Sequence, residues 1–186
     1  PCSDHGRTPP CADALIEAGI ARLVFAIEDP NPKVAGAGIR RMREADIDVA
    51  CGLMRDAARE LNRGFFSRFE RGRPWVRVKL AISLDGRTAL ANGESKWITG
   101  EAARADVQRW RARSSAILTG AGTARADDPR LTVRAGEGHG FQPLRVVLDV
   151  RLDALQPGAH LLGGSAPTLV LHGPDVQPKD DRYQRI

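Results

Sequence analysis

The chain has 186 residues, of which 42% are hydrophobic and 27% are charged. This composition indicates a soluble globular protein and excludes a disordered chain, and the length suits one ordinary domain or two small ones. Its longest apolar runs, such as LVFAI, are too short to cross a bilayer, and no signal-peptide pattern opens the sequence. We therefore expect a cytoplasmic protein with no membrane association.

The formal net charge is +5, which favours phosphorylated or other anionic partners. The 28 Lys and Arg residues alternate with 23 acidic residues and form no long basic run, so we do not expect nucleic-acid binding. The cysteines number three, too few and odd for a disulfide scaffold. Reduced thiols in the core or on a metal are expected instead.

The first part of the chain alternates between helix and strand patterns. Its expected elements are a helix at 12–19, a strand at 21–27, a helix at 39–45, a strand at 47–51 and a long helix at 54–69. This alternation predicts a parallel sheet with covering helices. The segment ERGRP at 70–74 combines charges with Gly72 and Pro74, which marks a domain boundary. We expect one domain at 1–72 and a second at 73–186.

The second part is also expected to be α/β. In WVRVKLAI at 75–82, apolar and basic residues alternate, which predicts a half-buried strand. A helix is expected at 101–113 with Thr99 as its cap, followed by strands at 116–120, 144–150 and 168–172. The motif TGAGT lacks the full Gly-x-Gly-x-x-Gly pattern and is weak support for a Rossmann fold, and GAGIRR is expected to start a helix.

Two cysteines stand out in the opening motif PCSDHGRTPPC. The prolines make a stiff loop, and Cys11 lies where a helix begins, whose positive end favours the thiolate form that binds zinc. Two thiolates provide half of a tetrahedral zinc site, whereas catalytic zinc needs three protein ligands and a water. We prefer zinc binding by Cys2 and Cys11 over the alternative of two buried, inert thiols.

Neighbouring residues leave other possibilities open. The mouth of this site is expected to be lined by Ser3, Asp4, His5 and Arg7. His5 is either a third zinc ligand or a surface or substrate contact. Cys51, at the end of an expected strand, is interpreted as a core residue.

Four long motifs resemble a known family. They are PCSDHGRTPPCADALIEAGI and DPNPKVAGAGI in the first part, and VKLAISLDGRTALANGESKWITG and ILTGAGTARADDPRLTVR in the second. Together they resemble the bifunctional riboflavin biosynthesis deaminase/reductase. The resemblance implies the C-terminal part of a cytidine-deaminase-like α/β/α domain, followed by the N-terminal part of a dihydrofolate-reductase-like domain. It also implies a homo-oligomer.

For the deaminase part, the resemblance makes Cys2 and Cys11 the two thiolate ligands of Zn²⁺. Zinc base deaminases also use a His-x-Glu motif, whose Glu moves protons. None of the four histidines is followed two residues later by Glu, so we expect this motif upstream of Pro1. The chain is therefore interpreted as an internal fragment that does not deaminate alone and holds no catalytic residue of that step.

For the reductase part, the resemblance implies NADPH as the cofactor. The positions that correspond to cofactor contacts are Ala81, Trp97, Thr123 and Asp127. The positions that correspond to substrate contacts are Ser95, Arg111, Leu131 and Arg134. Arginine suits this role because a planar guanidinium bonds two phosphate oxygens at once. Taken singly, Trp97 would be a core residue, Arg111 would edge a solvated helix face, and Asp127 would start a turn.

Some features depart from the family pattern. Asp4 replaces the usual His after PCS, Val150 replaces a Ser cofactor contact, and no later glycine-rich segment precedes Ile186. The implied activity is zinc-dependent deamination of a phosphorylated diaminopyrimidine nucleotide, followed by NADPH-dependent reduction of its ribosyl group to ribityl. The alternatives are a nucleic-acid or nucleoside zinc deaminase, and a noncatalytic module in which zinc staples a loop.

Overall fold

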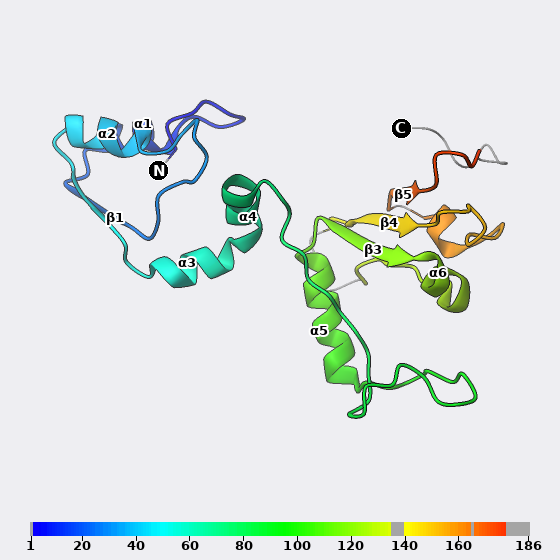
Figure 1. Cartoon of the computed structure of the whole chain (residues 1–186). Helices are drawn as coiled ribbons and strands as arrows, with labels where there is room; N and C mark the ends of the chain where they lie inside the picture. The colour runs from blue at the N-terminus through cyan, green and yellow to red at the C-terminus, as the bar shows by residue number, and fades with distance from the viewer. Residues whose placement is uncertain (1, 135–139, 165, 178–186) are drawn as a thin grey trace. The chain divides into compact units, whose positions relative to one another are not determined.

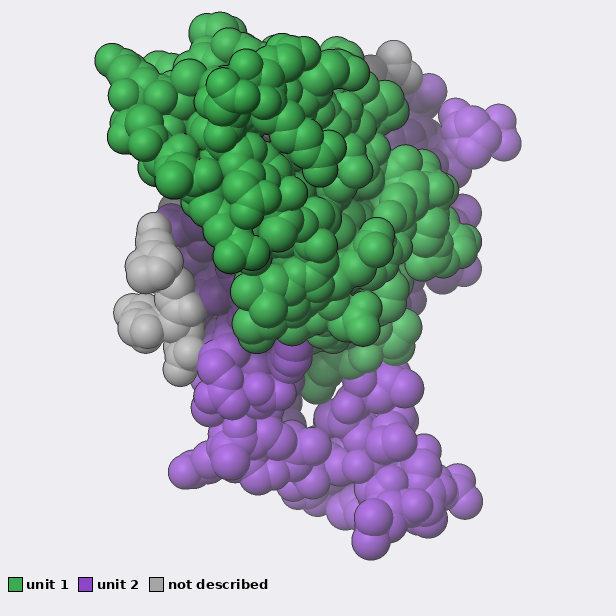
Figure 2. Space-filling model, turned by 90° about the vertical axis from the view of Figure 1, so that its left-hand side faces the viewer, with its two compact units in different colours: residues 1–79 green, residues 80–186 purple. Residues whose placement is uncertain are grey.

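The computed structural model describes residues 2–134, 140–164 and 166–177 (Figure 1). The chain divides into two compact units, Pro1–Lys79 and Leu80–Ile186, which Figure 2 colours separately. This division falls a few residues after the expected boundary at residue 72, which stays a prediction. Among the described residues, no helix is both long and apolar enough to span a membrane.

The first unit contains two parallel strands and four helices. In chain order these are α1 Cys11–Glu17, β1 Arg22–Phe25, α2 Ala37–Glu44, β2 Asp48–Cys51, α3 Arg55–Leu61 and α4 Arg63–Arg71. The two strands are paired so that Phe25 lies opposite Cys51. Helices α1 and α2 lie side by side (Figure 1), and the core between them and the strands is formed by Ala12, Met42 and Ile47. The predicted parallel pairing and the helix start in GAGIRR are both confirmed.

The long helix expected at 54–69 is instead two helices that meet at Asn62. Asn62 has φ −109° and ψ 25°, outside the helical range. Its side-chain amide donates a hydrogen bond to the carbonyl of Ala58 at 2.9 Å. A side chain that bonds nearby backbone competes with helix continuation, which explains a break that apolar periodicity does not reveal.

The strand expected at 75–82 is not formed among the described residues. Val76, Val78 and Leu80 are 74%, 76% and 68% exposed, so the alternating apolar face lies in solvent. An alternating pattern fits a pleated surface, but a strand also needs a neighbouring strand to bond its backbone. The described sheets pair only β1 with β2 and the strands of the second unit with one another.

The second unit is built on a parallel sheet with the strand order β3-β4-β5. Its elements are α5 Glu101–Ala112, β3 Ala116–Gly120, α6 Ala121–Asp127, β4 Leu144–Leu148, the short 3-10 helix η1 His160–Leu162 and β5 Thr168–Leu171. Helix α6 follows β3 directly and packs near β3 and β4 (Figure 1). The buried core cluster comprises Ala124, Leu131, Val147, Ala154, Leu155 and Leu161.

One sequence prediction about this unit needs correction, and one of its helices was not expected. The residue that caps α5 is Gly100 rather than Thr99, and no side chain caps that helix end. The motif TGAGT opens the unexpected helix α6, with Gly120 at its N-terminal cap position. Gly120 and Gly122 lie at the start of α6, and glycine has a low helix propensity. For this reason the sequence pattern did not predict the helix.

A buried arginine holds several loops of the second unit together. Arg145, on β4, is 3% exposed. Its guanidinium donates to the backbone carbonyls of Arg130, His160, Gly163 and Ala166 at 3.4, 3.1, 2.9 and 2.5 Å. A buried charge must be satisfied by hydrogen bonds. Through these bonds the arginine fixes the backbone that precedes β4 in the chain and the backbone that follows it.

Candidate functional site

The two cysteines predicted to bind zinc lie together. The Sγ atoms of Cys2 and Cys11 are 3.2 Å apart, and the backbone N–H of Cys11 donates to the Cys2 sulfur at 3.2 Å. Cys2 is half-buried and Cys11 is exposed, so neither thiol is fully buried in the structure. In a tetrahedral zinc site with Zn–S bonds of about 2.3 Å, two sulfur ligands lie about 3.8 Å apart. The two Sγ atoms therefore need to move apart only slightly to form half of such a site.

The surroundings of Cys2 favour its thiolate. Hydrogen bonds from the Cys11 backbone N–H and then from the Cys11 thiol lower the pKa of Cys2, and slight burial opposes them. A thiolate is the form that binds metal. Within the described residues, no three His, Cys, Asp or Glu side chains gather as a metal-binding group, and His5 is not grouped with the two cysteines.

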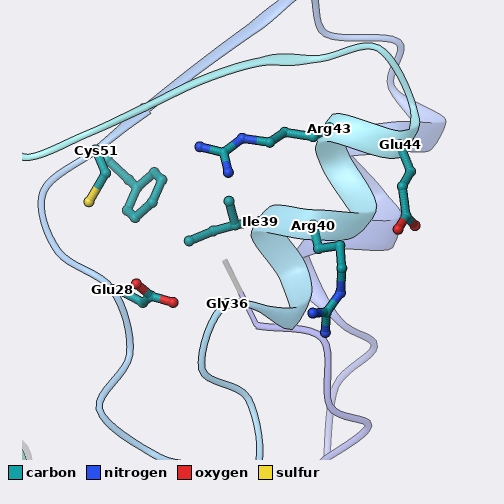
Figure 3. Close-up of a pocket in the computed structure, with 8 residues that line it drawn as sticks. Glu28, Gly36, Ile39, Arg40, Arg43, Glu44 and Cys51 are labelled. Atoms are coloured by element: carbon teal, nitrogen blue, oxygen red, sulfur yellow. The ribbon is translucent and has the colours of Figure 1, made fainter.

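Cys51 is not the core residue that the sequence suggested. It is exposed at the end of β2 and lines a hollow of about 590 Å³ at the C-terminal ends of the two strands (Figure 3). The hollow is also bordered by Phe25 and by Ile39, Arg40 and Arg43 of α2. Because this hollow rather than packed side chains lies beside Cys51, its thiol is open to solvent. None of the predicted site residues lines this hollow.

Two predicted substrate contacts, Arg111 and Arg134, lie close together in the second unit. Burial lowers the pKa of Arg111, and the neighbouring positive charge of Arg134 lowers it further. The Arg111 guanidinium donates to the carbonyl of Thr132 at 3.1 Å. Neither guanidinium forms an ion pair with a carboxylate of the described chain. Two neighbouring cations with no carboxylate partner among the described residues form a favourable site for a phosphate.

The backbone that carries Arg134 is held by side chains from other elements. Gln108 of α5 accepts a hydrogen bond from the Arg134 N–H at 3.2 Å. Gln142 accepts from the Val133 N–H at 2.9 Å and donates to the Val133 carbonyl at 3.0 Å. Leu131, predicted to contact substrate, has φ +50° and is 7% exposed. Its side chain belongs to the core, so only its backbone remains available to a ligand.

The predicted cofactor contacts fall into two groups. Thr123 and Asp127 are both exposed and lie four residues apart on α6, and therefore on one face of that helix. Trp97 is 70% exposed, so its ring does not lie in the core of the described structure. The guanidinium of Arg104 lies 4.5 Å from the Trp97 ring centroid, within the range of a cation–π interaction.

Other predicted contacts are not brought to the arginine pair. Ala81 is half-buried in the segment before α5, and Ser95 is exposed in the loop that precedes Trp97. In the described part of the chain, neither makes a hydrogen bond to Arg111 or Arg134. Sequence reasoning also missed Gln108, which is 8% exposed and is the buried residue of α5. The sequence did contain one indication of this residue: Gln108 is polar and lies three positions before Arg111, and residues at this spacing share a helix face.

Comparison with known proteins identifies the family. The model of the RibD C-terminal domain matches residues 74–182. The chain belongs to the RibD C-terminal domain family. Riboflavin biosynthesis protein RibD of Escherichia coli (strain K12) is 54% identical over 160 residues, covering 80% of this chain and 44% of that protein. RibD of Bacillus amyloliquefaciens is 48% identical over 182 residues, covering 97% and 49%.

Solved structures agree with this family. Acinetobacter baumannii RibD, form 1, superposes with a TM-score of 0.84 at 48% identity, over 92% of this chain and 49% of that chain. A Thermotoga maritima diaminohydroxyphosphoribosylaminopyrimidine deaminase/5-amino-6-(5-phosphoribosylamino)uracil reductase superposes with a TM-score of 0.86 at 37% identity, over 96% and 50%. The chain spans about half the length of the RibD relatives it matches. The family resemblance inferred from the motifs is confirmed, as is an α/β fold with parallel sheets.

Proposed function

We propose that the full-length protein containing this chain is a bifunctional enzyme of riboflavin biosynthesis. It hydrolyses the amino group of a phosphorylated diaminopyrimidine nucleotide and then reduces the ribosyl group of the product to ribityl. The names of the RibD relatives support the pathway, and the name of the Thermotoga maritima structure includes both a deaminase and a reductase. The two compact units support two separate sites.

In the deaminase step, Cys2 and Cys11 hold a metal through their thiolates. The hydrogen bond that the Cys2 sulfur accepts from the Cys11 N–H, together with its contact to the Cys11 thiol, lowers the pKa of Cys2 and so favours the thiolate form of this ligand. When bound, zinc supplies a hydroxide nucleophile at neutral pH and NADPH supplies a hydride. The deamination step also needs a third protein ligand for the metal and a carboxylate that moves protons. Neither is among the residues that lie together at the cysteine pair.

In the reductase step, the chain orients a charged substrate beside a flat cofactor ring. Arg111 and Arg134 bind the substrate phosphate, with Ser95 and the Leu131 backbone as further contacts. Trp97 offers an exposed aromatic face, supported by Arg104, on which a planar ring can stack. The exposed polar groups of Thr123 and Asp127 on α6, together with Ala81, bind the cofactor.

The observation that carries this proposal is the arginine pair. Arg111 is partly buried next to a second cation, an arrangement that costs free energy because like charges repel and burial removes hydration. A phosphate between the two guanidiniums would offset both costs. An ordinary solvated helix face would not require Arg111 to be buried beside another arginine.

The test uses Arg111→Met in the full-length protein, with Arg109→Met as the matched control. Arg109 is an exposed arginine on the same helix that pairs with Asp106. We expect Arg111→Met to raise the KM of the phosphorylated substrate by about 10- to 100-fold, as for loss of a charge-assisted contact of about 1.5–3 kcal/mol. Arg109→Met should change it less than twofold. Equal KM values in the two variants would contradict the phosphate role.

A further inference from the structure

The segment from Arg130 to Arg134 has no regular secondary structure, yet its backbone is bonded at nearly every residue. Its partners are side chains rather than a neighbouring strand: Arg145 at the Arg130 carbonyl, Arg111 at the Thr132 carbonyl, Gln142 at Val133 and Gln108 at the Arg134 N–H. Loops usually satisfy such groups with water. Here the chain instead fixes the path of the backbone that ends in Arg134.

Gln108 has a special place among these partners. It is 8% exposed and lies three residues before Arg111 on α5, so both side chains project from one face of the helix. Gln108 accepts from the Arg134 N–H, and Arg111 donates to the Thr132 carbonyl. One helix face therefore forms hydrogen bonds with two backbone groups of the same short segment.

These hydrogen bonds oppose the electrostatic repulsion between Arg111 and Arg134. The positive charge of Arg134 acts on Arg111, and no carboxylate of the described chain pairs with either guanidinium. Two unpaired cations move apart unless the backbone that carries one of them is held. A site for one phosphate needs them to stay together before the phosphate arrives, because preorganisation reduces the cost of binding.

We propose that Gln108 is a positioning residue that holds Arg134 beside Arg111 for a shared phosphate, with Gln142 supporting the same segment from the other side. The proposal rests on the phosphate role of the arginine pair proposed above and extends it to two neutral side chains. Neither glutamine donates to the phosphate. Each acts through the backbone of Val133 or Arg134.

The test is Gln108→Met in the full-length protein, because methionine keeps the length and burial of the side chain but accepts no strong hydrogen bond. The probe is inorganic phosphate as a competitive inhibitor against the phosphorylated substrate. We expect about a tenfold rise in the inhibition constant of phosphate and in the KM of the substrate, consistent with one lost buried hydrogen bond. The KM of NADPH should stay within twofold of the wild-type value.

The matched control is Gln156→Met, since Gln156 is an exposed glutamine whose side chain donates, among the described residues, to the Asp153 carbonyl alone. It should leave all these constants unchanged. If Gln108→Met does not fold, Gln142→Met serves as the second variant, with the same selective loss expected. A rise in the KM of NADPH equal to that of the substrate would show general disruption and would overturn the positioning role.

Arg134→Gln, measured in parallel, separates the two proposals. If it weakens phosphate inhibition while the glutamine variants do not, the positioning role is wrong and the phosphate role of the arginines stands. If Arg134→Gln leaves phosphate inhibition unchanged, the phosphate role itself is wrong and the inference about Gln108 goes with it.

Discussion

At the scale of single residues, the thiol of Cys2 is set apart by its hydrogen bonds. Donors from Cys11 lower its pKa, so the thiolate is populated at a lower pH than in a free cysteine. A depressed pKa contributes stability above the unfolded-state pKa, and this stability is lost as the pH falls through the folded-state pKa. Metal binding at this pair should follow the same direction and weaken in acid.

We predict that Cys2 in the metal-free protein is alkylated by iodoacetamide at a lower pH than N-acetylcysteine. The measurement is the rate of Cys2 modification against pH, followed by peptide mass spectrometry. Cys11→Ala removes only the thiol donor and keeps the backbone N–H, so it should shift the profile part of the way back. A Cys2 profile that coincides with that of N-acetylcysteine would show that these hydrogen bonds are absent in solution.

Arg145 yields a stability prediction. Replacing it with leucine removes the donors to three backbone carbonyls, of which that of Ala166 lies in a buried hydrogen bond and those of His160 and Gly163 lie in part-buried ones. Because each such loss costs about 1–3 kcal/mol, Arg145→Leu should lower the free energy of unfolding by at least about 3 kcal/mol. Arg125→Leu, which removes an exposed ion pair with Asp153, should cost about 1 kcal/mol or less. Urea unfolding of both variants measures the difference, and similar losses would refute the account of Arg145.

At the scale of elements, local patterns identified most helices and strands, including the parallel partners β1 and β2. They failed where a side chain or glycines within the segment alter the local backbone, or where a strand pattern lacks a neighbouring strand. The side chain of Asn62 ends α3, the glycines of TGAGT conceal α6, and the segment at 75–82 has a strand pattern without a strand partner. The same limit applies to the site: motifs indicated Arg111 and Arg134, whereas the roles of Gln108 and Gln142 follow only from backbone contacts across the fold.

The exposed segment at 75–82 gives a prediction for the 186-residue chain on its own. Val78 is 76% exposed within an alternating apolar face, which favours association with other chains. Val78→Lys should therefore reduce self-association without lowering the melting temperature, as measured by sedimentation velocity and thermal unfolding. Thr88→Lys adds the same charge at an exposed loop position and is the control. If both variants associate as strongly as the original chain, the chains do not associate through the apolar face of the segment at 75–82.

At the scale of the whole molecule, the chain consists of two units that carry different chemical groups. The first presents a thiol pair and the second an arginine pair, and the positive net charge favours phosphorylated substrates for both. The restart of the pattern after ERGRP predicts two α/β parts, and the boundary at residue 72 stays a prediction. The sequence could not reveal which residues become neighbours within each unit, because that depends on packing between distant segments.

The most direct test is product analysis by mass spectrometry of the full-length protein supplied with the phosphorylated diaminopyrimidine nucleotide and NADPH. We predict loss of the amino group followed by uptake of a hydride and a proton. Cys11→Ser should lose bound zinc and stop before deamination, yet still reduce the deaminated compound when it is supplied, whereas Cys51→Ser should perform both steps. Unchanged deamination by Cys11→Ser, or reduction without prior deamination in the wild type, would contradict the account.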